Sequence, residues 1–313
     1  MPGKLKSKNI FINLQTDNPQ ATNLKNMKPI LLLISLIPVF SFSQVNYRLY
    51  KEGDRFKYRL TSEVYRNDKF TGKTVSISEH TIVKDSGFLS EEVKWLHKTS
   101  YTSKDTINVD SIAQKIRPYK ISLSSKGKVL LPGLIVPEMV GDITDLNTFY
   151  VAVAPALNAQ KLSSENPIFI NDKLKQGNFA DSIEVLYGTD CLEVTQKLIS
   201  TNKKYTAIET SFAPPSSLCL TPLLDSIAKK SFSHFNNIEF IRKSEGGKVN
   251  LFWGVETFTI TSKVSKVNGQ IIEASMSNFL TLKMRYNASP DLKTYAIEMP
   301  VTIKRILTLE LLK

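Results

Sequence analysis

Residues 54–67 read DRFKYRLTSEVYRN, and this stretch decides the fold class. Its apolar side chains share one parity, at Phe56, Tyr58, Leu60 and Val64, while Arg, Lys, Thr and Glu occupy most of the other. Side chains of a β-strand point alternately to the two faces of a sheet, so a period of two is typical of a strand with one buried face. The stretch therefore predicts a long, half-buried β-strand.

The same alternation recurs further along the chain. In residues 255–286 the dipeptide Asn268-Gly269 is a strong hairpin signal between two alternating segments. Three other stretches each carry a set on one parity: 73–84 (Val75, Ile77, Val83), 93–101 (Val93, Trp95, His97, Thr99, Tyr101) and 301–312 (Val301, Ile303, Leu307, Leu309, Leu311). Together they predict a mainly β protein, built as a long-stranded curved antiparallel sheet, as two such sheets, or as an open half-barrel.

One or two short helices are expected beside the strands. Between residues 144 and 154 the apolar side chains recur at i, i+3, i+4 and i+7, which is the period of a helix; they are Leu146, Phe149, Tyr150 and Val153. Thr144 is expected to cap this helix and Pro155 to end it. A second helix is expected at 222–230, capped by Thr221.

Residues 27–44, MKPILLLISLIPVFSFSQ, predict a secretory signal peptide. The apolar run is too short for a spanning helix of about 20 residues, and small residues follow it. Cleavage is expected between Ser43 and Gln44, with Met27 as the start and residues 1–43 as N-terminal extension and leader. The region 44–313 is then exported to the periplasm or beyond, as one large domain or two similar sheet halves. The absence of Cys at position 44 predicts no lipid anchor.

Charge and cysteines leave several partners open. The net charge is +12, and the region after residue 43 keeps +8, because the leader holds five Lys and one Asp. The basic residues are scattered, without a nucleic-acid motif, so a lipid, a glycan or an envelope protein is a better candidate partner than nucleic acid. Cys191 and Cys219 either form a disulfide or are two small buried apolar residues.

No motif in the sequence predicts catalysis, a metal or a cofactor. The three histidines are far apart, and HExxH, CxxC, GxSxG, phosphate-loop and dinucleotide motifs are lacking. His97 shares a parity with Trp95 and is interpreted as lining a pocket or as a solvated strand residue. The candidate ligand-facing residues are Trp95, Asp142, Phe149 and Tyr150, of which Asp142 belongs to the polar and aromatic stretch PEMVGDITDLNTFY.

The predicted long strands with one crossing helix resemble the open half-barrels of bacterial periplasmic lipoprotein carriers. The segment YKEGDRFKYRLTSE, residues 50–63, is similar to the opening of a loose group of exported bacterial proteins. These resemblances imply a non-catalytic envelope protein that binds or carries an apolar or amphipathic ligand. Two alternatives remain: a hydrolase that acts through acidic residues distant in sequence, and an outer-membrane β-barrel.

Overall fold

The computed structural model describes residues 49–85, 88–122, 137–153, 168–171, 177–179, 183–186, 193–213, 237–242, 248–289 and 292–313. The chain divides into two units, Met1–Ser41 and Phe42–Lys313, and every described residue belongs to the second. The predicted cleavage site at Ser43 and Gln44, the cysteines Cys191 and Cys219, and the predicted helix 222–230 lie outside the described residues. These three features therefore stay predictions.

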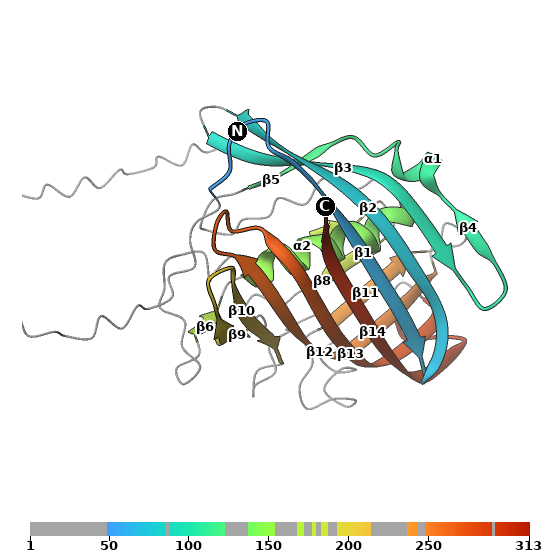
Figure 1. Ribbon diagram of the computed structural model, residues 1–313. Helices are drawn as coiled ribbons and strands as arrows, with labels where there is room; N and C mark the ends of the chain where they lie inside the picture. Colours follow the sequence, from blue (N-terminus) through green and yellow to red (C-terminus); the bar gives the residue numbers. More distant parts are fainter. Residues whose placement is uncertain are drawn as a thin grey trace, which may run out of the picture. The chain divides into compact units, whose positions relative to one another are not determined.

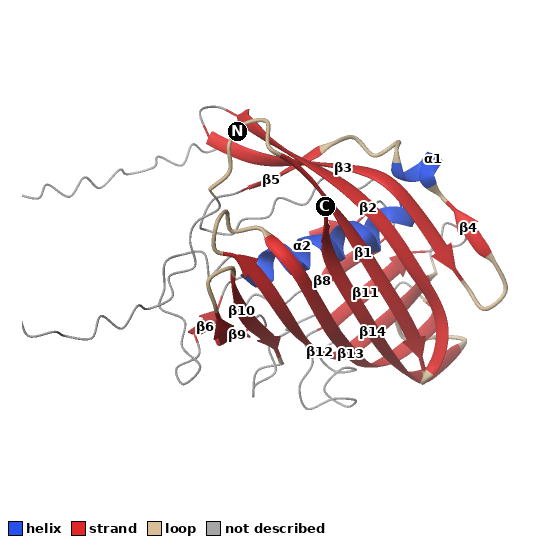
Figure 2. Ribbon diagram, in the orientation of Figure 1, coloured by secondary structure: helices blue, strands red, loops and turns tan. Residues whose placement is uncertain are grey.

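Fourteen strands of the described part form one open antiparallel sheet (Figures 1 and 2). Its main path runs β4-β3-β2-β1-β14-β13-β12-β10-β9-β6, and the sheet is not closed into a barrel. These strands are β1 (Arg55–Arg66), β2 (Lys69–Asp85), β3 (Phe88–Tyr101), β4 (Thr106–Asn108), β6 (Ile168–Asn171), β9 (Glu193–Thr201), β10 (Tyr205–Phe212), β12 (Val249–Ser265), β13 (Ile271–Ala288) and β14 (Ile297–Leu312). The prediction of a long-stranded, open antiparallel sheet is confirmed.

The other strands branch from this path. They are β5 (Tyr119–Ser122), β7 (Gly177–Phe179), β8 (Ile183–Leu186) and β11 (Asn237–Arg242). β5 pairs with β3, and β11, β8 and β7 follow one another from the first half of β12. The second half of β12 pairs with β10 instead, so the sheet forks along this strand.

The helix expected at 144–154 is α2 (Val140–Val153), and it lies on the concave side of the sheet (Figure 1). The predicted start was wrong. A 3-10 turn, η1 (Pro137–Met139), leads directly into α2, and proline is favoured where a helix begins. Thr144 is therefore not a cap, and its hydroxyl donates to the Val140 carbonyl at 2.8 Å. A further short helix, α1 (Asp110–Ala113), was not predicted.

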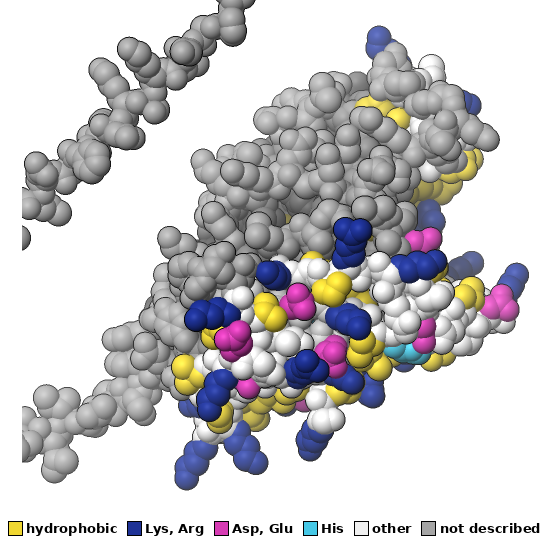
Figure 3. Space-filling view, turned by 90° about the horizontal axis from the view of Figure 1, so that it is seen from above, with side chains coloured by type: hydrophobic (Ala, Val, Ile, Leu, Met, Phe, Trp, Pro, Cys, Tyr) yellow, Lys and Arg dark blue, Asp and Glu magenta, His cyan; other side chains and the backbone are white. Residues whose placement is uncertain are grey.

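Strand pairing sorts the side chains onto an inner face toward α2 and an outer face. Inner residues of β13 and β14 pair directly, as Met276 does with Leu307 and Leu282 with Val301. Charged pairs occupy the outer face: Lys57–Glu79, Arg59–Glu310, Lys73–Glu63, Lys197–Glu209, Lys263–Glu273 and Lys283–Glu298. Figure 3 shows basic and acidic side chains interspersed over the described surface in that view. The alternation predicted for β1, β13 and β14 is thus a division between a solvated face and an inner one.

β2 reverses the expected pattern. Ser76, Ser78 and His80 are buried on the inner face, while Val75 and Ile77 lie half-buried on the outer one. The prediction that the apolar parity of β2 is the buried one was therefore wrong. The physical reason is that α2 and β3 provide carboxylate and phenol groups that bind the buried polar side chains of β2.

The shared parity predicted for Trp95 and His97 was also wrong. The register between β2 and β3 shifts at this point, since Ile77 pairs with His97 but Ser78 pairs with Trp95. This bulge turns Trp95 and Lys98 inward and leaves His97 partly exposed. His97 bonds Asp110 through Nδ1 at 2.7 Å, so it does not line the interior.

Gly254 lies in β12 at the fork of the sheet, and it leads to a prediction. A Cβ atom at this position would overlap the Thr281 carbonyl oxygen and lie 2.9 Å from the Leu282 Cα. Gly254→Ala is therefore expected to lower the free energy of unfolding by at least about 1–3 kcal/mol, since backbone atoms cannot rotate away. Urea unfolding checks this; Gly141→Ala, where a Cβ meets nothing within 4 Å, is the control. Equal stability of Gly254→Ala and wild type would contradict the strand geometry.

Candidate functional site

α2 is enclosed on most of its surface. The four residues of the predicted stripe, Leu146, Phe149, Tyr150 and Val153, belong to the hydrophobic cluster that packs on the sheet. Asp142, Asp145 and Asn147 are also buried, with exposures of 4–5%. A buried carboxylate is costly unless it is paired, so the partners of these groups define the site beneath the helix.

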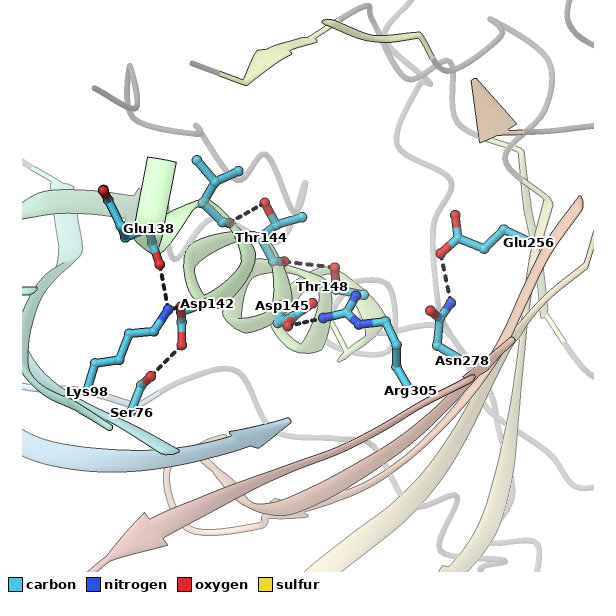
Figure 4. Close-up of polar contacts among 11 residues, drawn as sticks. Ser76, Lys98, Glu138, Asp142, Thr144, Asp145, Thr148, Glu256, Asn278 and Arg305 are labelled. Atoms are coloured by element: carbon cyan, nitrogen blue, oxygen red, sulfur yellow. Dashed lines mark hydrogen bonds and ion pairs between the residues drawn. The ribbon is translucent and has the colours of Figure 1, made fainter. Parts of the chain in front are cut away.

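Lys98, Asp142 and Ser76 form the first part of that site (Figure 4). The Lys98 ammonium donates to the Asp142 carboxylate and, at 2.5 Å, to the Glu138 carbonyl. The Ser76 hydroxyl donates to the other oxygen of Asp142. Strands β2 and β3 thereby hold the first turn of α2 through one buried ion pair.

Arg305 and Asp145 form the second part. Arg305 rises from β14 toward the side of α2 that faces the sheet and donates through Nη2 to Asp145 (Figure 4). Burial raises the pKa of the Asp145 carboxyl, and the Arg305 guanidinium opposes this rise. Burial alone would lower the pKa of Arg305, but the carboxylates of Asp145, Glu256 and Asp142 together outweigh burial and the pKa is raised. Arg305 and Asp145 thus each favour the charged form of the other, against the effect of burial.

Glu256 and Asn278 form the third part. The Asn278 amide donates to the Glu256 carboxylate at 2.7 Å, and Asn278 lies directly opposite Arg305 in the β13–β14 pairing. Glu256 and Asp142 also raise the pKa of Arg305, in addition to Asp145. We call the set Lys98, Asp142, Asp145, Glu256, Asn278 and Arg305 the charged cluster.

An apolar inner surface adjoins the charged cluster. It comprises the buried residues Leu280, Leu282, Met284 and Val301 and the half-buried Phe252, Met299 and Ile303. Direct pairing places Glu256 opposite Leu280, and Met284 opposite Met299. Among the described residues, the cluster packed on α2 does not include the four buried members of this surface. The inner face is therefore amphipathic along β13 and β14.

His80 lies in a second network on the inner face, four residues along β2 from Ser76. Its Nδ1 contacts Glu91 Oε1 at 2.5 Å, its Nε2 contacts the Ser78 hydroxyl at 2.8 Å, and Tyr150 donates to Glu91. The order Ser–His–Glu repeats the contacts of a nucleophile, a base and an orienting acid. However, Ser78 is 1% exposed and three aromatic rings, from Phe56, Tyr58 and Tyr150, pack on His80. We therefore interpret the network as a structural contact that joins β2, β3 and α2.

Tyr119 and Trp95 are buried near the His80 network. Burial raises the pKa of the Tyr119 hydroxyl, and the nearby Trp95 indole offsets this in part without meeting the geometry of a hydrogen bond. Within the described part of the chain, no group of three or more His, Cys, Asp or Glu side chains is placed to hold a metal ion. No helix of that part has the length and apolar character needed to cross a membrane.

The four residues predicted to face a ligand are all buried on the inner side of the sheet. Trp95 and Phe149 are fully buried in the packed cluster, Tyr150 belongs to the His80 network, and only Asp142 belongs to the charged cluster. Their contact with a ligand stays a prediction. Sequence reasoning missed Arg305, Glu256 and Asn278, although Arg305 and Asn278 are each a polar residue on an otherwise apolar parity of their strands.

In the described part of the chain, the fold is an open antiparallel sheet that encloses α2 and a buried charged cluster. No protein-family model matches the chain, and a search of curated proteins finds no match. Among solved structures, one similar chain comes from a structure described as "Lipid-protein interactions in lipovitellin", with a TM-score of 0.44 and 10% sequence identity. The match covers 84% of this chain and 25% of that one, so this chain spans about a quarter of its length.

Proposed function

We propose that this protein is an exported envelope protein that binds and carries an amphipathic ligand with an acyl chain. The observation that supports this most is the apolar inner surface bordered by the charged cluster. An acyl chain needs a continuous apolar surface, and its head needs polar partners at one end of that surface. β13 offers both in succession, because Asn278, Leu280, Leu282 and Met284 follow one another on its inner face.

Two properties of the apolar inner surface suit a variable acyl chain. Met284 and Met299 are paired at its far end, and methionine adapts to irregular apolar shapes because its side chain is unbranched and flexible. Gly254, opposite Leu282, contributes no side chain to the inner face. The surface therefore combines adaptable side chains with a glycine over which the Leu282 side chain packs.

A binding titration with matched variants tests the proposal. Wild type is expected to enhance the emission of a monoacylglycerol that carries a polarity-sensitive fluorophore on its chain. Leu282→Gln, at a position that lies between Gly254 and Val301 in the sheet, places an amide on the apolar surface, which costs about 1–3 kcal/mol when it finds no partner. The affinity should fall about tenfold or more.

Phe279→Gln is the control for this titration. Phe279 is adjacent to the same stretch of β13 but lies on the outer face and is 44% exposed. Its variant should bind the probe like wild type, with thermal unfolding recorded for all three proteins. Absence of probe binding by folded wild type, or equal loss in both variants, would refute the proposal.

A further inference from the structure

We infer that two neighbouring turns at one end of the sheet bind the surface of a lipid bilayer that contains anionic lipids. The turns are 202–204, between β9 and β10, and 266–270, between β12 and β13. The side chains concerned are Leu49, Lys203, Lys204, Lys266 and Val267, which we call the lysine tip. This inference goes beyond the proposed function, because it needs no ligand on the inner face.

Backbone hydrogen bonds hold the segments of the lysine tip together. β10 and β12 pair as far as the two turns, and the Lys266 N–H then donates to the Lys204 carbonyl at 3.0 Å. The Leu49 N–H donates to the Asn268 carbonyl at 3.1 Å. Both turns and the start of the described chain lie on the left of Figure 1. Three segments that are distant in sequence thus form one surface.

Two apolar side chains of the lysine tip face solvent. Val267 is 74% exposed and Leu49 is 62% exposed, more than any other large apolar side chain of the described part. The turn that carries Val267 is well ordered by hydrogen bonds, because the Ser265 hydroxyl accepts from the N–H groups of Val267 and Asn268 and the Ser265 carbonyl accepts from Gly269. Val267 is therefore held outward, where insertion between lipid head groups would remove its apolar surface from water.

The lysine tip carries an excess of positive charge beside these apolar side chains. The turns 202–204 and 266–270 contain three lysines and no acidic residue. The first acidic residue on β13, Glu273, is bonded by Lys263 at 2.5 Å. Anionic lipids attract lysines that lie close to the bilayer, and the attraction falls off within about 10 Å. Basic and apolar side chains on one surface are the combination that binds such a bilayer.

The opposite end of the sheet differs in charge and supplies a matched control. Its turns 67–68, between β1 and β2, and 102–105, between β3 and β4, place an exposed lysine next to an aspartate in each case. These lysines are Lys69, beside Asp68, and Lys104, beside Asp105. Reversal of both charges there alters the net charge of the protein as much as reversal of Lys203 and Lys204, which are also exposed.

Co-sedimentation of the full chain with lipid vesicles, without acylglycerol, tests the inference. Wild type should bind vesicles of phosphatidylcholine mixed with phosphatidylglycerol at least about tenfold more tightly than phosphatidylcholine alone, because each lysine near an anionic surface strengthens binding roughly fivefold. Added salt should reduce this difference. The variant with both Lys203→Glu and Lys204→Glu should retain a preference of less than about twofold. The variant with both Lys69→Glu and Lys104→Glu should bind like wild type.

A second pair of variants tests the apolar part of the lysine tip. Val267→Ser should weaken binding to the mixed vesicles about threefold or more. Ile107→Ser is its control, since Ile107 on β4 is 51% exposed but lies outside the lysine tip, and it should bind like wild type. Circular dichroism should show the same folded signal for every variant.

The outcomes separate this inference from the proposed function. Equal binding of wild type to both kinds of vesicle would overturn the inference, and so would an equal loss in the two double variants or unchanged binding by Val267→Ser. All variants share residues 1–43, so any binding by that segment is common to them. The proposed function is tested by the acylglycerol titration without vesicles, and either result can fail while the other stands.

Discussion

Arg305→Leu is expected to lower the free energy of unfolding by about 3–5 kcal/mol at pH 7. The change removes the cation that contacts Asp145, whose side chain is 5% exposed, and leaves a buried carboxylate without its partner. Replacing one member of a buried pair costs more than replacing both, because the uncompensated charge is the main penalty. Chemical unfolding of Arg305→Leu, Asp145→Leu and the double variant measures this coupling.

The double variant should recover a large part of the loss, since two leucines at these positions leave no buried charge. Arg59→Leu is the exposed control, because the Arg59–Glu310 pair lies on the outer face with both side chains about half exposed. Exposed pairs contribute about 0–1 kcal/mol. A loss as small for Arg305→Leu as for Arg59→Leu would contradict the buried pair.

The loss in Arg305→Leu should also depend on pH. Burial raises the pKa of Asp145, and removal of Arg305 takes away the group that opposes this rise. A carboxyl with a raised pKa takes up its proton earlier in the folded state than in the unfolded chain, so lower pH favours folding. The difference from wild type should therefore be largest near pH 7 and shrink toward pH 5. A difference that grows as the pH falls would contradict this account.

Phe149→Ala is expected to cost about 3–5 kcal/mol, the second large effect. Phe149 is fully buried and belongs to the cluster between α2 and the sheet, so the change leaves a cavity under the helix. A helix of this kind is stable mainly through its buried side chains. Thermal and urea unfolding measure the loss.

The control is Phe279→Ala, because Phe279 is 44% exposed on the outer face. It should cost far less than Phe149→Ala. If α2 were a lid over the ligand, Phe149→Ala would leave stability nearly unchanged and alter probe binding instead. That result would overturn the packed position of the helix.

Strand parity predicted the sheet from sequence because β1, β13 and β14 each alternate over many residues. It failed on β2, where Ser76, Ser78 and His80 face inward, since their partners Asp142, Glu91 and Tyr150 come from other elements. It failed on β3 because a one-residue bulge reverses parity, and no residue type announces it. Local sequence pattern therefore predicts alternation along a strand, but it predicts neither the distant partners of buried polar residues nor the position of a bulge.

The charged cluster was beyond prediction for a related reason. Arg305 falls on the apolar parity of 301–312, which marks it as unusual in sequence. Its partner Asp145 is 160 residues away, and the local pattern of neither segment predicts the pairing. α2 begins at Val140, so Asp145 lies beyond its first turn and its charge is not explained by the start of the helix. Only the pairing of β14 with β13 and the position of α2 bring these groups together.

Methionine methyl resonances will report whether an acyl ligand binds on the apolar inner surface, as we propose. Met284 and Met299 pair on that surface, whereas Met139 is fully buried in the cluster packed on α2. Titration of methyl-labelled protein with a monoacylglycerol should shift the signals of Met284 and Met299 and leave that of Met139 in place. Unchanged signals at Met284 and Met299 under saturating ligand, or shifts confined to Met139, would contradict the account.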